Sequence, residues 1–148
     1  MHDAGLHFKF VAFERLLRRH PEWRDRLCFV QIGVRPRVGL SGARSEQQRR
    51  DLDQIRSKID VIVERVNREL HTSTGQPSIF FEEVERCSLD QRVGLYCATS
   101  VFVSTPLREG MCLYSFEFIA TKAAQRETAL VLGSRPGLRP VVVLSEFR

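Results

Sequence analysis

The sequence contains no apolar run that approaches the roughly 20 residues a membrane-spanning helix needs. Its first residues, 1–4, lack the charged and apolar pattern of a signal peptide. These two absences predict a cytoplasmic protein without a membrane partner.

Metal-binding and disulfide patterns are also missing. The four cysteines, Cys28, Cys87, Cys97 and Cys112, form no C-x-x-C pair, and the four histidines are scattered along the chain. The sequence therefore indicates neither a zinc site nor a disulfide framework, and we expect no metal.

Basic residues outnumber acidic ones and give a formal net charge of +5, yet no aromatic residues alternate with a basic stripe. Most of the basic residues are arginines that stand among acids, as Arg24 and Arg26 do beside Asp25. This pattern favours a solvated charged surface over a nucleic-acid interface. The composition, with 43% hydrophobic and 28% charged residues in 148, fits one soluble domain with a core.

Apolar periodicity predicts helices and strands in alternation. The expected helices cover residues 6–19, 45–70, 88–96 and 112–124, and the expected strands cover residues 27–34, 78–81, 101–103 and 141–144. Ser45 and Ser88 are the expected caps of the second and third helices. This order predicts an α/β fold, a mostly parallel sheet with helices on both faces and right-handed crossovers.

Two features near the carboxyl end bear on domain organisation. Residues 125–140 are polar and rich in Gly and Pro, which predicts an inserted surface loop. No helix follows the last strand, so one face of the sheet is short of cover. We therefore expect residues 1–148 to form a single partial domain of a larger unit.

The junction between the strand at 101–103 and the following helix is a candidate anion site. The helix leaves its first N–H groups unpaired and turns the positive end of its dipole outward. Such a helix end binds anions, and Arg108 adds a planar cation suited to phosphate. Gly110 allows the backbone to approach a ligand closely.

Several motifs together resemble the trehalose-6-phosphate synthase family of glycosyltransferases. They are PLREGMxL at 106–113, EFIA at 117–120, VLSEF at 143–147, the segment 5–23 that ends in HPEW, the strand VQI at 30–32 and the pair LY at 95–96. The resemblance covers nearly the whole chain in the order of the family. It implies the Rossmann-like, nucleotide-sugar-binding, carboxyl-terminal half of a two-domain GT-B fold, whose amino-terminal half supplies acceptor contacts.

The resemblance also implies an activity in trehalose biosynthesis. Glucose would pass from UDP-glucose to glucose 6-phosphate with retention at the anomeric carbon, without a metal or another cofactor. The implied partners are the nucleotide sugar, the sugar phosphate, the amino-terminal half-domain and a synthase/phosphatase assembly.

The site residues carried over from the family pattern lie in one stretch. Glu109 stands where the family has an Asp that hydrogen-bonds the donor sugar, and Glu117 matches the acid that holds the ribose hydroxyls. No residue is assigned to catalysis. The implied nucleotide and diphosphate contacts are Arg108, Gly110, Met111, Cys112, Leu113 and Glu117, with Met111, Cys112 and Leu113 contributing backbone N–H groups.

Alternatives stay open for two of these residues. Arg108 has a second interpretation as a surface loop arginine, and Glu117 has a second interpretation as an ion-pair partner of Lys122 or of an arginine.

Three departures from the family pattern lead to two hypotheses on function. Ala4 stands where the family has a Lys that neutralises the diphosphate, Glu109 replaces an Asp, and Cys112 replaces an Asn. The chain is then either the donor half of an active synthase, inactive as an isolated fragment, or a degenerate non-catalytic module that binds a nucleotide or sugar phosphate. A scaffold that binds nothing is a third alternative.

Overall fold

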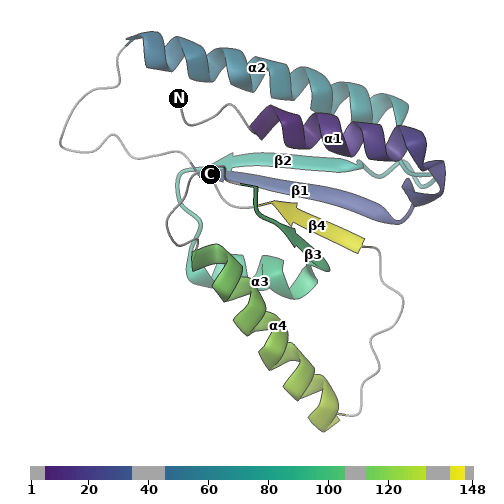
Figure 1. The fold of residues 1–148 in the computed structure, drawn as a ribbon, viewed down its shortest axis with the longest axis vertical. Coiled ribbons are helices and arrows are strands. Elements are labelled where there is room, and N and C mark those ends of the chain that lie inside the picture. Colours follow the sequence, from purple (N-terminus) through teal and green to yellow (C-terminus); the bar gives the residue numbers. More distant parts are fainter. Residues whose placement is uncertain (1–5, 35–45, 106–112, 133–140, 146–148) are drawn as a thin grey trace.

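The structure is a computed structural model that describes residues 6–34, 46–105, 113–132 and 141–145 (Figure 1). The helices are α1 (Leu6–Arg19), the 3-10 turn η1 (Pro21–Trp23), α2 (Glu46–Glu69), α3 (Leu89–Ala98) and α4 (Leu113–Leu132), and the strands are β1 (Leu27–Val34), β2 (Ile79–Val84), β3 (Val101–Val103) and β4 (Val141–Ser145). Helices and strands alternate as the sequence predicts.

The strands form one parallel sheet in the order β2-β1-β4-β3. Phe29 of β1 lies opposite Ile79 of β2 on one side and opposite Val143 of β4 on the other. Val101 of β3 also pairs with Val143. Because β1 and β4 are internal strands, their mostly apolar sequences fit positions that are covered on both faces.

Helices α1 and α2 cover one face of the sheet (Figure 1). The aromatic ring of Phe29 packs edge-on against Phe10 at 5.4 Å and stacks on Phe13 at 5.1 Å, centroid to centroid. The buried residues of this core are Phe10, Phe13, Leu17, Leu27, Phe29, Ile59, Ile62, Val66, Leu70 and Ile79. They are the apolar stripes that the helical spacing of both segments predicts.

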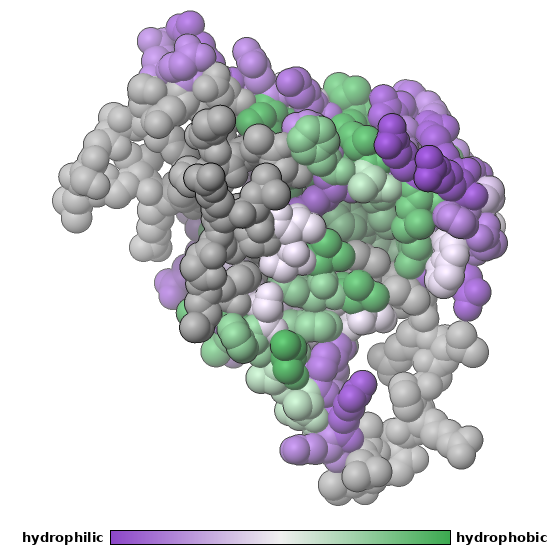
Figure 2. All heavy atoms as spheres, viewed as in Figure 1, coloured by the Kyte–Doolittle hydropathy of each residue, from purple (hydrophilic) through white to green (hydrophobic). Residues whose placement is uncertain are grey.

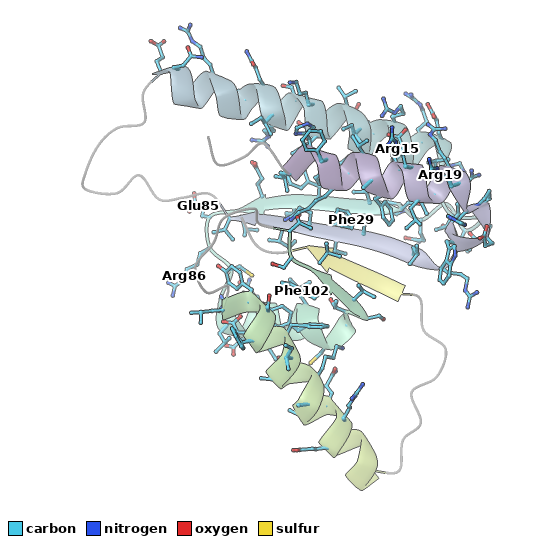
Figure 3. The ribbon with its side chains drawn as sticks, in the orientation of Figure 1. Arg15, Arg19, Phe29, Glu85, Arg86 and Phe102 are labelled. Carbon is cyan, nitrogen blue, oxygen red and sulfur yellow. The ribbon has the colours of Figure 1, made fainter. Side chains whose placement is uncertain are left out.

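Helices α3 and α4 cover the opposite face, around buried Ile32 and Tyr96. Figure 3 shows Phe29 on the α1 side of the sheet and Phe102 on the α3 side. Along β1, Leu27 and Phe29 join the first core, whereas Val30, Ile32 and Val34 join the second. This alternation is the two-residue period of a strand. The predicted fold class, a parallel sheet with helices on both faces, is confirmed.

The predicted inserted loop at 125–140 is wrong in its first half. Helix α4 continues to Leu132, so residues 125–132 are helical. The segment around Ala123, Ala124 and Gln125 consists largely of strong helix formers, and the first Gly or Pro is Gly133. The Gly and Pro residues that suggested a loop begin only there, and 133–140 lie outside the described residues.

Two smaller boundaries also differ from the prediction. Strand β2 extends to Val84, beyond the expected end at residue 81, because the long neighbour β1 offers it pairing partners as far as Val34. The expected cap Ser45 lies outside the described residues. Ser88, by contrast, caps α3 in a reciprocal box with Gln91, as its position predicts.

The outer surfaces of the helical layers differ in polarity. Figure 2 shows hydrophilic residues along the outer side of α2 and hydrophobic residues on the amino-terminal part of α4. Leu113, Phe116 and Ile119 of α4 are all exposed. Within the described ranges no helix combines the length and the apolar character that crossing a membrane requires.

Candidate functional site

The candidate site is built where α3 and α4 lie side by side beneath the sheet (Figure 1). All strands are parallel, so their carboxyl ends meet at one edge, and α3 begins shortly after β2 ends at this edge. In open α/β sheets this edge is where ligands bind. Arg92 and Tyr96 of α3 and Glu117 of α4 converge there.

Arg92 donates two parallel hydrogen bonds to the carboxylate of Glu117. Its Nε donates to Oε2 and its Nη2 donates to Oε1, both at 2.8 Å. The hydroxyl of Tyr96 donates to the same Oε2 at 3.1 Å. The side chains of Arg92 and Glu117 are 17% and 26% exposed, so this bidentate pair is largely shielded from water.

Arg92 is itself held from two further directions. Its Nη1 donates to the carbonyl oxygen of Cys87 at 2.8 Å, and its guanidinium lies 5.4 Å above the ring of Tyr114. Arg92 and Tyr96 are four residues apart on α3, and Tyr114 and Glu117 are three residues apart on α4, which places each pair on one helix face. We call Arg92, Tyr96, Tyr114 and Glu117 the carboxylate clamp.

The clamp fixes the protonation state of its members. The hydrogen bonds from Arg92 lower the pKa of Glu117; burial acts in the opposite direction, and the Tyr96 bond adds to the lowering. The bond to Glu117 raises the pKa of Arg92. Burial, followed by the bond to Glu117, raises the pKa of Tyr96. At neutral pH the clamp therefore holds an ionised carboxylate between a permanent cation and a neutral hydroxyl donor.

The clamped carboxylate keeps room for a ligand. A carboxylate has about four lone-pair positions, of which Arg92 and Tyr96 use three. Glu117 lies one turn into α4 and remains partly exposed. About one position is left for a further donor, such as a hydroxyl group of a sugar.

The structure describes two of the predicted site residues. Leu113 is the exposed first residue of α4, where helical N–H groups have no partner within the helix. Glu117 pairs with an arginine, one of its two alternatives, whereas Lys122 donates to the carbonyl of Cys97 and to the side chain of Gln125. Arg108, Glu109, Gly110, Met111 and Cys112 lie outside the described residues, so their roles stay predictions.

Sequence reasoning missed Arg92 and Tyr96. The pattern of 88–96 predicts only a capped helix with some apolar residues that leads to the strand at 101–103, and it assigns no role to Arg92. The available signal is the four-residue spacing of Arg92 and Tyr96 on a helix that begins at the carboxyl edge of the sheet.

Other polar groups among the described residues lie apart from the clamp, including the network of Glu14, Arg18, Arg65 and Glu69 between α1 and α2. The described residues contain no group of three or more His, Cys, Asp or Glu side chains placed to hold a metal. An open hollow on the outer side of α1 and α2 is lined by His7, Ser57, Lys58, Val61, Ile62 and Arg65. It lies on the other face of the sheet from Glu117.

The sequence model of glycosyltransferase family 20 matches residues 3–148 of this chain. The chain belongs to this family.

Its relatives include proteins of plants, fungi and archaea. A probable alpha,alpha-trehalose-phosphate synthase [UDP-forming] 4 of Arabidopsis thaliana is 31% identical over 97% of this chain and 15% of its own length. An alpha,alpha-trehalose-phosphate synthase [UDP-forming] 2 of Aspergillus fumigatus is 31% identical over 90% of this chain and 25% of its own length. A bifunctional trehalose-6-phosphate synthase/phosphatase of Thermoproteus tenax is 34% identical over 82% of this chain and 15% of its own length.

The chain thus spans between 15% and 25% of these relatives. No solved structure gives a significant match to it.

Proposed function

We propose that this chain is the nucleotide-sugar-binding part of a trehalose-6-phosphate synthase-like glycosyltransferase and that it binds UDP-glucose. Family membership supports the class of reaction. The observation that carries the proposal is the carboxylate of Glu117, ionised, partly exposed and held at the carboxyl edge of a parallel sheet.

Each predicted residue then has a physical role toward the donor. Glu117 accepts hydrogen bonds from the ribose hydroxyls, and Glu109 accepts one from the glucose. The N–H groups of 111–113 and the guanidinium of Arg108 face the diphosphate. Donors of this kind stabilise the charge that develops on a diphosphate leaving group, so no metal is needed for that purpose.

The acceptor side of the reaction needs more than this chain. We propose that glucose 6-phosphate is bound with the help of an amino-terminal half-domain, and that the whole protein works in the cytoplasm. The name of the Thermoproteus tenax relative, a bifunctional synthase/phosphatase, supports a synthase/phosphatase assembly as its setting. The 148 residues alone are expected to bind the donor without turnover.

A second candidate is a non-catalytic binding module of the same family. Ala4 removes a cation at the diphosphate, and Glu109 is one methylene longer than the Asp of the pattern. A contact displaced by about 1 Å costs on the order of a hundredfold in rate, whereas binding through Glu117 is untouched by either change.

Calorimetric titration with UDP and UDP-glucose tests the proposal. The parent chain should bind both, and Arg108→Ala and Glu117→Gln should each weaken binding by about tenfold or more, because each removes a charged hydrogen-bond partner. A parent chain that binds neither ligand at millimolar concentration contradicts the proposal. Release of UDP that depends on added glucose 6-phosphate would contradict the expected inactivity of the isolated chain.

A further inference from the structure

We infer that Arg92 is a positioning residue, which orients the carboxylate of Glu117 toward the ribose hydroxyls of the bound nucleotide. This inference rests on the proposed function, because it concerns the same ligand. The observation behind it is the bidentate contact, in which two atoms of Arg92 reach two atoms of Glu117 at 2.8 Å.

A bidentate contact fixes more than a distance. A glutamate side chain turns about several single bonds, and one hydrogen bond leaves the carboxylate plane free to rotate. Two parallel bonds from a planar guanidinium set that plane, and the Tyr96 hydroxyl donates a third bond to one of the two oxygens. The remaining acceptor position therefore points in a defined direction before any ligand arrives.

Arg92 is held by contacts other than the one with Glu117. Arg92 is tied to the carbonyl of Cys87, one residue before the cap of α3, and packs on the ring of Tyr114. The bond to the carbonyl of Cys87 ties Arg92 to the chain that leads into α3, and the Tyr114 ring adds a contact from α4. Glu117 lies on α4 and Arg92 lies on α3. The direction of the Glu117 carboxylate therefore depends on where α3 lies relative to α4.

A pre-oriented acceptor binds with a smaller loss of side-chain freedom than a mobile one. A purely structural ion pair between α3 and α4 would stabilise the fold without favouring any ligand group. The two roles make different predictions for ligands that differ only in their ribose hydroxyls.

The test compares UDP with 2′,3′-dideoxyuridine diphosphate by calorimetry. The parent chain should bind UDP about tenfold more tightly than the dideoxy compound, as expected for hydrogen bonds to a charged acceptor. In Arg92→Gln this ratio should fall to about threefold or less. Arg126→Gln, an exposed arginine on the same helix as Glu117, is the matched control and should keep the parent ratio.

Two further variants cover the case in which Arg92→Gln does not fold. Tyr96→Phe keeps the buried ring and removes the third hydrogen bond to Glu117, and Arg92→Lys keeps the charge but not the planar fork. Both should lower the ratio, with circular dichroism confirming a folded chain.

The outcomes separate the two proposals. If folded Arg92→Gln, Arg92→Lys and Tyr96→Phe all keep the parent ratio, Arg92 is structural and the inference is wrong while nucleotide binding stands. If the parent binds both compounds equally, the ribose role of Glu117 and the inference fail together, although the chain still binds the nucleotide. A parent that does not bind UDP overturns the proposed function as well.

Discussion

Arg65 of α2 donates to both carboxylate oxygens of Glu14 on α1, from Nε to Oε1 at 3.1 Å and from Nη2 to Oε2 at 2.6 Å. Arg18 adds two bonds to the same Oε1 and reaches Glu69 of α2 at 2.7 Å. Glu14 is buried in the contact between the helices. This network joins α1 to α2.

Glu14→Gln should lower the free energy of unfolding by about 1–2 kcal/mol, because an amide replaces an acceptor of charged hydrogen bonds. Urea unfolding followed by circular dichroism measures the change. Glu64→Gln, an exposed position on α2, is the control and should change stability by less than about 0.5 kcal/mol. Equal effects of the two variants would show that the network contributes nothing specific.

Acid should destabilise the fold through the same carboxylates. Burial raises the pKa of Glu14, but the bonds from Arg65 and Arg18 outweigh it and hold the pKa below its ordinary value. The pKa of Glu117 is also lowered, by Arg92 first. A lowered folded-state pKa contributes stability above the unfolded value of about 4.3, and this stability is lost as the pH falls through the folded value.

Urea midpoints measured from pH 7 downward should therefore stay nearly constant at first and fall below about pH 4.5. The decline should be shallower in Glu14→Gln, which has lost one of the groups that take up a proton. An equally steep decline of the urea midpoint in parent and variant would show that protonation of Glu14 does not contribute to the loss of stability.

Ser88→Ala should lower the free energy of unfolding by about 1 kcal/mol, because the Ser88 hydroxyl accepts a hydrogen bond from the N–H of Gln91 at the start of α3. Ser100→Ala, at an exposed position after the same helix, serves as the control. Thermal unfolding of the two variants provides the comparison. A loss as large in Ser100→Ala would contradict the capping role.

Glu127→Pro tests the length of α4. A proline removes a helical N–H and clashes with the preceding turn, at a cost of up to about 3 kcal/mol in a helix interior. The variant should lose helical circular dichroism, whereas Glu127→Ala should not. Unchanged spectra in both would favour the surface loop that the sequence predicts at this position.

The order of elements and the fold class follow from the sequence because they depend on local patterns. The run from Leu27 to Val34 is nearly all apolar, and the helices on either side have their apolar residues at helical spacing. The end of α4 does not follow, since the Gly and Pro residues after Leu132 make the whole stretch look irregular.

The candidate site was predictable only in part. Glu117 is found through the family pattern, whereas its partner Arg92 is 25 residues away in the sequence. A contact across that distance depends on how α3 and α4 pack, and neither helix specifies this alone. Arg108 and Glu109 lie outside the described residues, and the titration of Arg108→Ala tests the role of the first.

Strand β1 packs directly beneath the clamp through one of its buried residues. Ile32 of β1 is buried together with Tyr96, which donates to Glu117. A change of volume at Ile32 would therefore shift a donor of the clamp and, under the proposed function, alter nucleotide affinity. The same change at Phe29, whose side chain faces α1, would alter only the free energy of unfolding. The two faces of β1 thus serve different purposes, one packing beneath the clamp and the other packing against α1 and α2.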